Sequence, residues 1–350
     1  MPRTVRQSAE DGAEPLVDTT QALTLNSKKL ERQRKKQQRR AAKTAASLPT
    51  GHILDLPYEL ILKVLELLRP SDIFRLSRTC KAFHTFLRDE EDTIAKKLID
   101  YRYVAISKCF RLPVRASQLE ASVHTTLNDD TRQEIITMRK KPYQHIKSPD
   151  PSVICTCLTC LLRWNSLNLI LDFNYWQDNL DKGEPIPLIP RGKYPEWNTL
   201  LTHDNASYVL KALDSPIWHA LLLERHLNSM VRSISRQRAN KGNKRRRFRM
   251  TAEDEAAETD LFLERSGPPS TELPFSREQY YLLETYMPNR GWSGEREEWM
   301  YMPADQHERD VAFAVRVAEW RRKKVELEQG PKDADMRTPE ADGLLHAQKT

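Results

Sequence analysis

The stretch that decides the fold is residues 56–87, which read LPYELILKVLELLRPSDIFRLSRTCKAFHTFL. Its prolines and capping residues predict three short helices with two tight joins. Pro57 stands where a first helix begins, a position that proline tolerates because no helical hydrogen bond is lost there. Pro70 ends that helix, since the residue before a proline is pushed out of helical geometry, and Ser71 can cap the second. A third helix is predicted to begin near Lys81.

The first of these helices is apolar on almost every side. Between Leu60 and Leu68 the polar residues are Lys63 and Glu66, whereas a surface helix usually carries one apolar stripe. Two other short helices cannot cover so much apolar surface, because a module of about 45 residues is close to the lower limit for independent folding. Large apolar patches on soluble proteins usually mark the seat of a partner. The residues themselves therefore predict a protein interface.

The order of these residues resembles the F-box. That pattern is Leu-Pro-x-Glu, an apolar helix, a break before Asp-(Ile/Leu), then Leu-x-x-x-Cys-Lys and an aromatic residue. This sequence supplies Leu56, Pro57, Glu59, the helix Leu60 to Leu68, Pro70, Asp72, Ile73, Leu76, Cys80, Lys81 and Phe83. The family most often has tryptophan at the place of Phe83, so an aromatic side chain is retained. The match covers about an eighth of the chain.

The resemblance implies a substrate receptor that docks on the Skp-type adaptor of a cullin-RING (SCF-type) ubiquitin ligase and presents a client for ubiquitination. The residues it implies for the adaptor-facing surface are Leu56, Pro57, Leu60, Ile61, Val64, Leu65 and Leu68. Those it implies for the core of the module are Ile73, Leu76, Cys80 and Phe83. The alternative, that all of them are the ordinary core of a helical domain, stays open.

The apolar spacing elsewhere predicts a mainly α fold, an F-box module followed by an irregular all-helical region. The predicted parts are a disordered basic tail (1–50), the F-box module with a trailing helix (51–112), a linker (113–152), a helical region (153–236), a disordered charged insertion (237–272), a helical continuation (273–330) and a disordered tail (331–350).

The region after the linker holds four of the seven tryptophans. Large aromatic side chains at this density need a core that buries them. Its segments CLTCLLRW (157–164), EPIP (184–187), EWN (196–198) and SPIW (215–218) resemble the helical region that follows the F-box in a group of fungal F-box proteins. That resemblance implies a client-binding part or its scaffold.

Two further helices have clear sequence limits. Ser215-Pro216 is typical of a helix start, with a capping hydroxyl before a proline. A last helix is predicted from about His307 to Gln329, with Phe313, Val317 and Trp320 on its inner face.

Three cysteines in the pattern Cys155-x-Cys157-x-x-Cys160 invite a zinc interpretation, because closely spaced thiolates can share a tetrahedral ion. A fourth ligand is missing from the pattern, since the nearest histidines, His145 and His203, stand alone. Cys157 and Cys160 also fall on an apolar helix face, where a thiol behaves as a small hydrophobe. The sequence therefore favours packing over metal, and we predict no cofactor and no metal.

The sequence offers no catalytic motif. It contains no G-x-G-x-x-G, no P-loop, no G-x-S-x-G and no RING-type Cys/His array, and 10 glycines in 350 residues make phosphate-cradling loops unexpected. We therefore predict a non-catalytic subunit rather than an enzyme.

Two basic runs, residues 28–43 and 236–249, each carry a net charge of +8, so the rest of this chain of net charge +7 is acidic. They are candidate nuclear-import signals, nucleic-acid contacts or solvated charge. The residues that form their compact clusters are Arg34, Lys35, Lys36, Arg39, Arg40, Lys244, Arg245, Arg246 and Arg247. Phe248 is the one aromatic residue in these two runs, and this scarcity of side chains that stack on bases argues against nucleic acid as a partner. The rival to the ligase hypothesis is a nuclear nucleic-acid-binding or scaffold protein.

The N-terminal residues lack the apolar stretch of a signal peptide, and no stretch of the sequence is apolar enough for a membrane span. We expect an intracellular protein of the nucleus or cytoplasm, with reduced cysteines and without a membrane partner.

Overall fold

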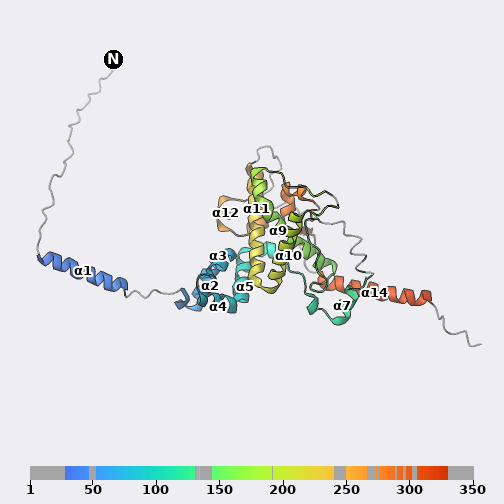
Figure 1. The fold of residues 1–350 in the computed structure, drawn as a ribbon, viewed down its shortest axis with the longest axis horizontal. Helices are drawn as coiled ribbons and strands as arrows, with labels where there is room; N and C mark the ends of the chain where they lie inside the picture. The colour runs from blue at the N-terminus through green and yellow to red at the C-terminus, as the bar shows by residue number, and fades with distance from the viewer. Residues whose placement is uncertain are drawn as a thin grey trace, which may run out of the picture. The chain divides into compact units, whose positions relative to one another are not determined.

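The structure is a computed structural model of the chain (Figure 1). The residues that it describes are 28–46, 53–130, 132, 134, 144–190, 192–239, 250–265, 273–274, 276–287, 290–294, 297–301 and 306–329. They divide into two compact units, Met1–Pro57 and Tyr58–Thr350, which we describe separately.

The first unit contains the helix α1 (Lys28–Ala46) and the 3-10 turn η1 (Ile53–Asp55). The sequence predicts a disordered tail here, with a transient helix through the basic run. The structure instead forms the whole run into α1, whose described side chains are all exposed. Lys35 and Glu31, one turn apart, pair at 4.0 Å.

The second unit is built around three long helices, α9 (Leu158–Lys182), α10 (Glu196–Asp214) and α11 (Pro216–Ala239). As the sequence predicts, α11 begins at the proline of Ser215-Pro216. The helix α9 begins after Cys157 and ends at Gly183, whose φ of 70° suits a residue without a Cβ atom. Figure 1 shows α11 (yellow) beside α9 (green), and α11 also packs against α10.

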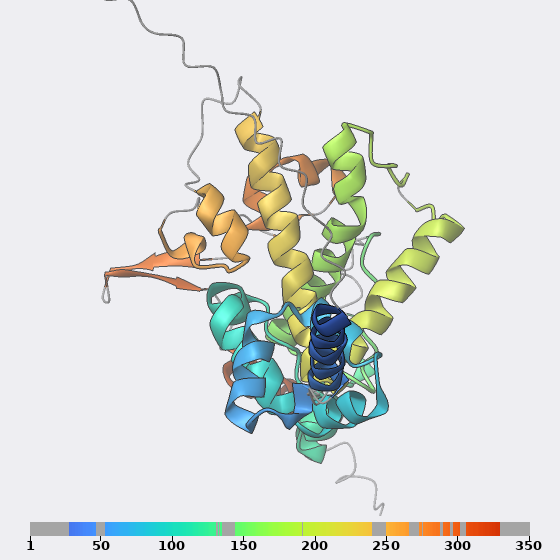
Figure 2. The same cartoon turned by 90° about the vertical axis from the view of Figure 1, so that its left-hand side faces the viewer.

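Four short helices precede this bundle: α2 (Tyr58–Leu67), α3 (Pro70–Leu76), α4 (Lys81–Asp89) and α5 (Glu91–Arg102). They are followed by α6 (Val104–Cys109), η2 (Ala116–Gln118) and α7 (Ala121–Leu127). The helices α3, α5 and α6 pack against α11, and α2 and α4 pack against α5 (Figure 2). The helix α11 therefore packs against both the short helices and the other two long helices.

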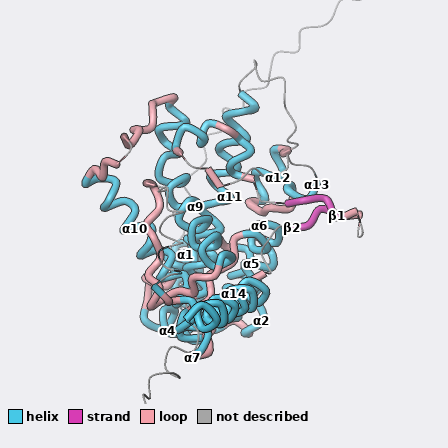
Figure 3. Tube along the Cα trace, turned by 90° about the vertical axis from the view of Figure 1, so that its right-hand side faces the viewer, coloured by secondary structure: helices cyan, strands magenta, loops and turns pink. Residues whose placement is uncertain are grey.

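The remaining elements are short, apart from the last helix. They are α12 (Ala252–Ala257), α13 (Phe262–Arg265), η3 (Arg277–Tyr281), η4 (Leu283–Tyr286), β1 (Arg290–Ser293), β2 (Glu298–Tyr301) and α14 (His307–Gln329). Figure 3 shows how far helices dominate, and the prediction of a mainly α fold is confirmed. The sequence did not predict the antiparallel pair β1–β2, in which Arg290 lies opposite Tyr301.

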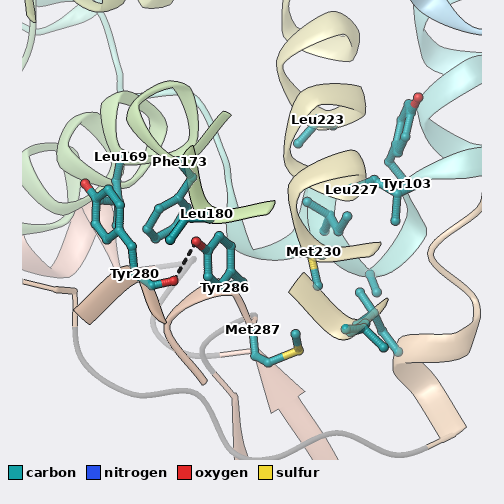
Figure 4. Close-up of a cluster of buried hydrophobic side chains, with 14 of the residues drawn as sticks. Tyr103, Leu169, Phe173, Leu180, Leu223, Leu227, Met230, Tyr280, Tyr286 and Met287 are labelled. Carbon is teal, nitrogen blue, oxygen red and sulfur yellow. Dashed lines mark hydrogen bonds between the residues drawn. The ribbon is translucent and has the colours of Figure 1, made fainter. Parts of the chain in front are cut away.

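The largest core gathers side chains from parts of the chain that are far apart. Tyr103 after α5, Phe173 of α9, Leu223 of α11, Tyr280 of η3 and Tyr286 of η4 are all 1% exposed or less (Figure 4). The Tyr286 hydroxyl donates to the Tyr280 backbone carbonyl at 2.8 Å. Residues 276–287 are thereby tied to the bundle, although some 40 residues separate them from α11.

A buried ion pair crosses this core. The Arg277 guanidinium donates two hydrogen bonds to the Asp172 carboxylate, both at 2.8 Å, and one to Asn198 at 3.0 Å. The Tyr280 hydroxyl donates to the same carboxylate at 2.6 Å. A bidentate pair with additional donors is the arrangement in which burial of two charges is tolerated.

Two segments are packed more fully than the sequence predicts, one expected to be a linker and the other a disordered insertion. In the predicted linker 113–152, Ala116, Leu127 and Ile146 are buried. In the predicted insertion 237–272, Met250 and Phe262 enter the main core. The packing of these segments could not be predicted because their few apolar residues have no periodicity and are buried against distant helices. Residues 240–249 and 266–272 lie outside the described part.

The helix α14 has the predicted bounds but not the predicted inner face. Ala314 is buried and Val317 half-buried, whereas Phe313 and Trp320 are 63% and 61% exposed. The face that packs is set by neighbouring α7 and α9, which contact mainly the first turns of α14. Among the described helices, none has the length and apolarity needed to cross a membrane.

Candidate functional site

The helices α2, α3 and α4 are connected at the positions predicted from the sequence. The helix α3 begins at Pro70, and Asp72 in its first turn pairs with Arg69 at 3.0 Å, favoured by the positive end of the helix dipole. The helix α4 is capped by Cys80, whose sulfur accepts the backbone N–H of Phe83 at 3.4 Å. Phe83 is 1% exposed, so this cap holds an aromatic side chain in the core.

The apolar helix α2 has two distinct faces. Ile61, Leu62 and Leu65 point into the core and are 7% exposed or less. On the other side Leu60, Val64 and Leu67 are exposed by 52%, 37% and 63%. These three residues are four and three positions apart, so they form one line along the helix, which we call the α2 stripe.

A polar border accompanies the α2 stripe. Lys63 and Glu66 of the same helix pair at 3.0 Å, and Lys63 lies one turn from both Leu60 and Leu67. An apolar line with polar neighbours is the anatomy of protein interfaces that form and dissociate.

The structure divides the seven predicted adaptor-facing residues. Leu60 and Val64 are exposed in the α2 stripe, and in the first unit Leu56 and Pro57 are exposed as well. Ile61 and Leu65 are buried and Leu68 is half-buried, which corrects their placement on the surface. The reason is helical geometry, because residues four apart share a face and Ile61 and Leu65 share the one that meets α5.

Of the residues predicted to form the core of the module, Ile73 and Phe83 are buried, and Leu76 and Cys80 are half-buried. Sequence reasoning missed Leu67, the most exposed member of the α2 stripe. It could have been found from its spacing of seven from Leu60.

Residues 53–94 match the family model of the F-box domain. The chain carries an F-box domain. The match begins at η1 and ends within α5, so it includes α2, α3, α4 and the α2 stripe. No curated protein and no solved structure matches the chain. The resemblance of residues 157–218 to fungal F-box proteins stays a prediction.

From α2 onward, the F-box domain is joined to the bundle by carboxylates that cap helix N-termini. The Glu224 carboxylate of α11 accepts the Ser71 backbone N–H at 2.8 Å and the Ser71 hydroxyl at 2.6 Å. In the opposite direction, Glu91 of α5 accepts from the Ser215 hydroxyl and from the Ile217 backbone N–H, the latter at 3.2 Å. Each cap satisfies donors at the start of a helix with a negative charge.

A buried arginine closes the end of α2. Arg102 is 5% exposed, and its guanidinium donates to the backbone carbonyls of Leu67, Leu68 (3.1 Å) and Glu258 (3.3 Å). The backbone of Asp260 donates back to the Arg102 carbonyl at 2.9 Å. The last turn of the F-box helix is therefore fixed by a residue from α5, which no local sequence signal indicates.

The candidate import residues are only partly within the described structure. Arg34, Lys35, Lys36 and Arg39 are exposed on α1. The side chain of Arg40 and the whole cluster Lys244 to Arg247 lie outside the described residues.

The three clustered cysteines have a neighbour that the sequence did not reveal. Cys155, Cys157 and Cys160 are buried, and His307, which is 147 residues beyond Cys160, lies beside them. Hydrogen bonds with the other two thiols lower the pKa of Cys155 and raise that of Cys160. The cysteine pattern lacks a fourth ligand in the sequence, but His307 stands at that place in the fold.

Proposed function

We propose that this F-box protein docks on the Skp-type adaptor of a cullin-RING ubiquitin ligase, and that the α2 stripe is the centre of the docking surface. F-box domains generally bind such adaptors, and the domain match therefore supports the class of partner. The observation that carries the proposal is the line of Leu60, Val64 and Leu67, exposed on a helix that needs none of them for its core. Leu56 and Pro57, just before α2 in the sequence, belong to the proposal as further adaptor contacts because the F-box pattern includes them.

In this proposal the chain acts by proximity. The F-box domain attaches to the ligase, and the helical body from about residue 153 to residue 329 holds a client near the site of ubiquitin transfer. No bond is made or broken in this chain, which acts as a non-catalytic subunit. The chemical nature of the client stays open.

The α2 stripe sets the size of the expected effect. Covering the exposed part of Leu60 and Leu67 stabilises a complex by about 1–1.5 kcal/mol for each, on a scale of about 1.5–3 kcal/mol for burying a whole leucine. A variant with Leu60→Ala and Leu67→Ala should therefore bind a purified Skp-type adaptor about 30–150 times more weakly than the wild type. Calorimetric titration of the full chain measures this directly.

A matched control is Leu200→Ala, because Leu200 is 60% exposed on α10 and belongs to no part of the proposed surface. It should leave the dissociation constant unchanged. Both variants should keep the wild-type stability, since alanine is a good helix former and the replaced side chains are exposed. Undiminished adaptor binding by the Leu60/Leu67 variant contradicts the proposed surface, and no binding by the wild type contradicts the proposed function.

A second role rests on α1. We infer that its exposed Arg34, Lys35 and Lys36 form a nuclear-import signal, because a compact, accessible basic cluster is what import receptors bind. Replacing the three with alanine should move a fluorescently tagged chain from the nucleus to the cytoplasm. Unchanged nuclear accumulation, together with unchanged retention on nucleic acid, removes both the import role and the rival nucleic-acid role from α1.

A further inference from the structure

Four metal-ligating side chains converge where α14 meets α9. The Cys157 Sγ and the Cys160 Sγ lie 3.3 and 3.4 Å from the His307 Nδ1, and the ligand atoms of all four residues, Cys155 included, lie within 4.8 Å of one another. Cys157 caps α9, Cys160 is in its first turn, and His307 is the first residue of α14. All three cysteines are buried and His307 is half-buried.

We propose that Cys155, Cys157, Cys160 and His307 bind one zinc ion as a structural site. Three thiolates and one imidazole make a complete tetrahedral set, and closed sets of this kind are typical of structural zinc. With Zn–S and Zn–N bonds of about 2.3 and 2.0 Å, such a site separates a sulfur from a nitrogen by about 3.5 Å and two sulfurs by about 3.8 Å. The two sulfur–nitrogen separations in the fold, 3.3 and 3.4 Å, are close to the first value, and all pairs of ligand atoms lie within 4.8 Å.

Each sulfur already has a backbone donor. The N–H of Cys157 donates to the Cys155 Sγ, that of Cys160 to the Cys157 Sγ, and that of Val114 to the Cys160 Sγ, all at 3.4 Å. Backbone donors of this kind orient the ligand atoms of a metal site, as outer-shell partners do. Cys157 also stands at the start of the 25-residue α9, so the helix fixes its position relative to Cys160.

The charge around the cluster also fits a zinc site. Three thiolates and a neutral imidazole leave a zinc complex with one negative charge. Arg132 donates to the Thr156 carbonyl at 3.1 Å, and its guanidinium interacts electrostatically with Cys157 and Cys155. Its buried Nε has no hydrogen-bond partner within the described structure. Such a cation would offset the single negative charge of the zinc complex.

Simple packing explains the cluster less well. The cysteines do share a small apolar core with Leu127 and Ala314. A thiol–imidazole hydrogen bond accounts for one of the two sulfur contacts of the His307 Nδ1, whereas a shared ion accounts for the convergence of all four ligand atoms. An iron–sulfur cluster is also a poorer fit, because several metal ions would hold their ligands farther apart than 4.8 Å.

The proposed ion would hold α14 in place. Beyond its first turns this helix buries little, since Phe313, Trp320 and Leu327 are 63%, 61% and 84% exposed. Apart from His307, its first turn is attached by Asp310, whose carboxylate accepts the Thr159 backbone N–H at 2.8 Å and the Thr159 hydroxyl. A metal ion would add a link between α14 and the start of α9 that depends on few apolar contacts.

The test is the zinc content of the full chain, purified under reducing conditions without chelator and measured by elemental mass spectrometry. One zinc ion per chain is expected. Cys157→Ala and His307→Ala should each lower the retained zinc by about tenfold or more after dialysis, since loss of even an outer partner of a zinc ligand costs about 10–100-fold in affinity. The matched controls are Cys109→Ala, a cysteine outside the cluster, and His203→Ala, an exposed histidine; both should keep full occupancy.

Cobalt provides a readout that does not depend on zinc affinity. Reconstitution of the chelated chain with Co²⁺ should give the visible bands of a tetrahedral site and a near-ultraviolet thiolate-to-cobalt band. His307→Ala, whose substitution leaves the buried thiols in place, should weaken or shift these bands while circular dichroism still reports a folded chain.

Three outcomes overturn the proposal. One is a wild-type chain that holds no stoichiometric zinc and gives no thiolate-to-cobalt band. Another is a His307→Ala chain with the zinc content of the wild type. A pair of cysteines found oxidised to a disulfide in the freshly purified chain, by mass and by resistance to alkylation, also overturns it.

Discussion

The contact between Ser71 and Glu224 tests whether the F-box helices and the long bundle form one cooperative body. The Glu224 carboxylate accepts two hydrogen bonds from Ser71, at 2.8 and 2.6 Å, in a partly buried place. A hydrogen bond to a charged group contributes about 1.5–3 kcal/mol, and partial burial favours the lower end of that range. Glu224→Ala removes both bonds and should lower the free energy of unfolding by about 3–4 kcal/mol, whereas Ser71→Ala removes only the hydroxyl bond and should cost about 1.5–2 kcal/mol.

The double variant isolates the interaction. If the hydroxyl and the carboxylate are bonded, Ser71→Ala should cost almost nothing once Glu224 is alanine, giving a coupling energy of about 1.5–2 kcal/mol. Urea unfolding of the full chain, followed by circular dichroism and by tryptophan fluorescence, measures the free energy of unfolding of the wild type, the two single variants and the double variant. As a control, Asp204→Ala, which removes a carboxylate 83% exposed on α10, should be additive with Ser71→Ala.

A coupling energy below about 0.5 kcal/mol, the usual limit of additivity, refutes the contact between Ser71 and Glu224. The union of the two regions is refuted by a different result, two separate unfolding transitions in the wild type, because these show that α2–α5 melt independently of α11.

Three further predictions follow from the buried side chains. Asp172→Ala leaves Arg277 buried without its partner, so it should cost about 3–5 kcal/mol in urea unfolding; a cost below about 1 contradicts the buried pair. Phe83→Ala should cost about 3–5 kcal/mol, because the ring is 1% exposed; a near-zero cost places it outside the core. Burial lowers the pKa of His145 to about 4 and of His226 to about 3. Below pH of about 6.5 the unfolded chain therefore binds protons that the folded chain does not, and each histidine should cost about 2 kcal/mol of stability by pH 5. Stability that rises on acidification over this range contradicts their burial.

The sequence predicts features that depend on neighbouring residues. The join at Pro70, the start of α11 at Pro216 and the extent of α14 all follow from proline, capping residues and helical spacing. The F-box domain was recognisable because its pattern lies within 42 consecutive residues, 53–94.

The orientation of a helix is harder to predict when its pattern has no clear phase. The helix α2 is apolar nearly all round, so its sequence does not indicate that Ile61 and Leu65 face inward while Leu60 and Leu67 face outward. That choice is made by α5, which packs on one side.

Contacts between residues far apart in the sequence could not be predicted either. Asp260 lies in an acidic segment that resembles a loop, yet its carboxylate accepts the backbone N–H groups of Ala105 and Ile106 at 2.7 Å. His307 likewise becomes a potential ligand only when α14 folds against the start of α9. No periodicity or spacing in the sequence records such pairs, because the chain between them can take many paths.

The exposed leucines of α2 also bear on the lifetime of the chain in a cell. If the docking that we propose takes place, a copy without an adaptor presents Leu60, Val64 and Leu67 to water, and exposed apolar surface is one of the features by which chaperones and proteases sort incompletely folded chains. Copies made in excess of the proposed adaptor should then be degraded faster than assembled ones. The abundance of this protein would be set by the supply of that partner as much as by its own rate of synthesis.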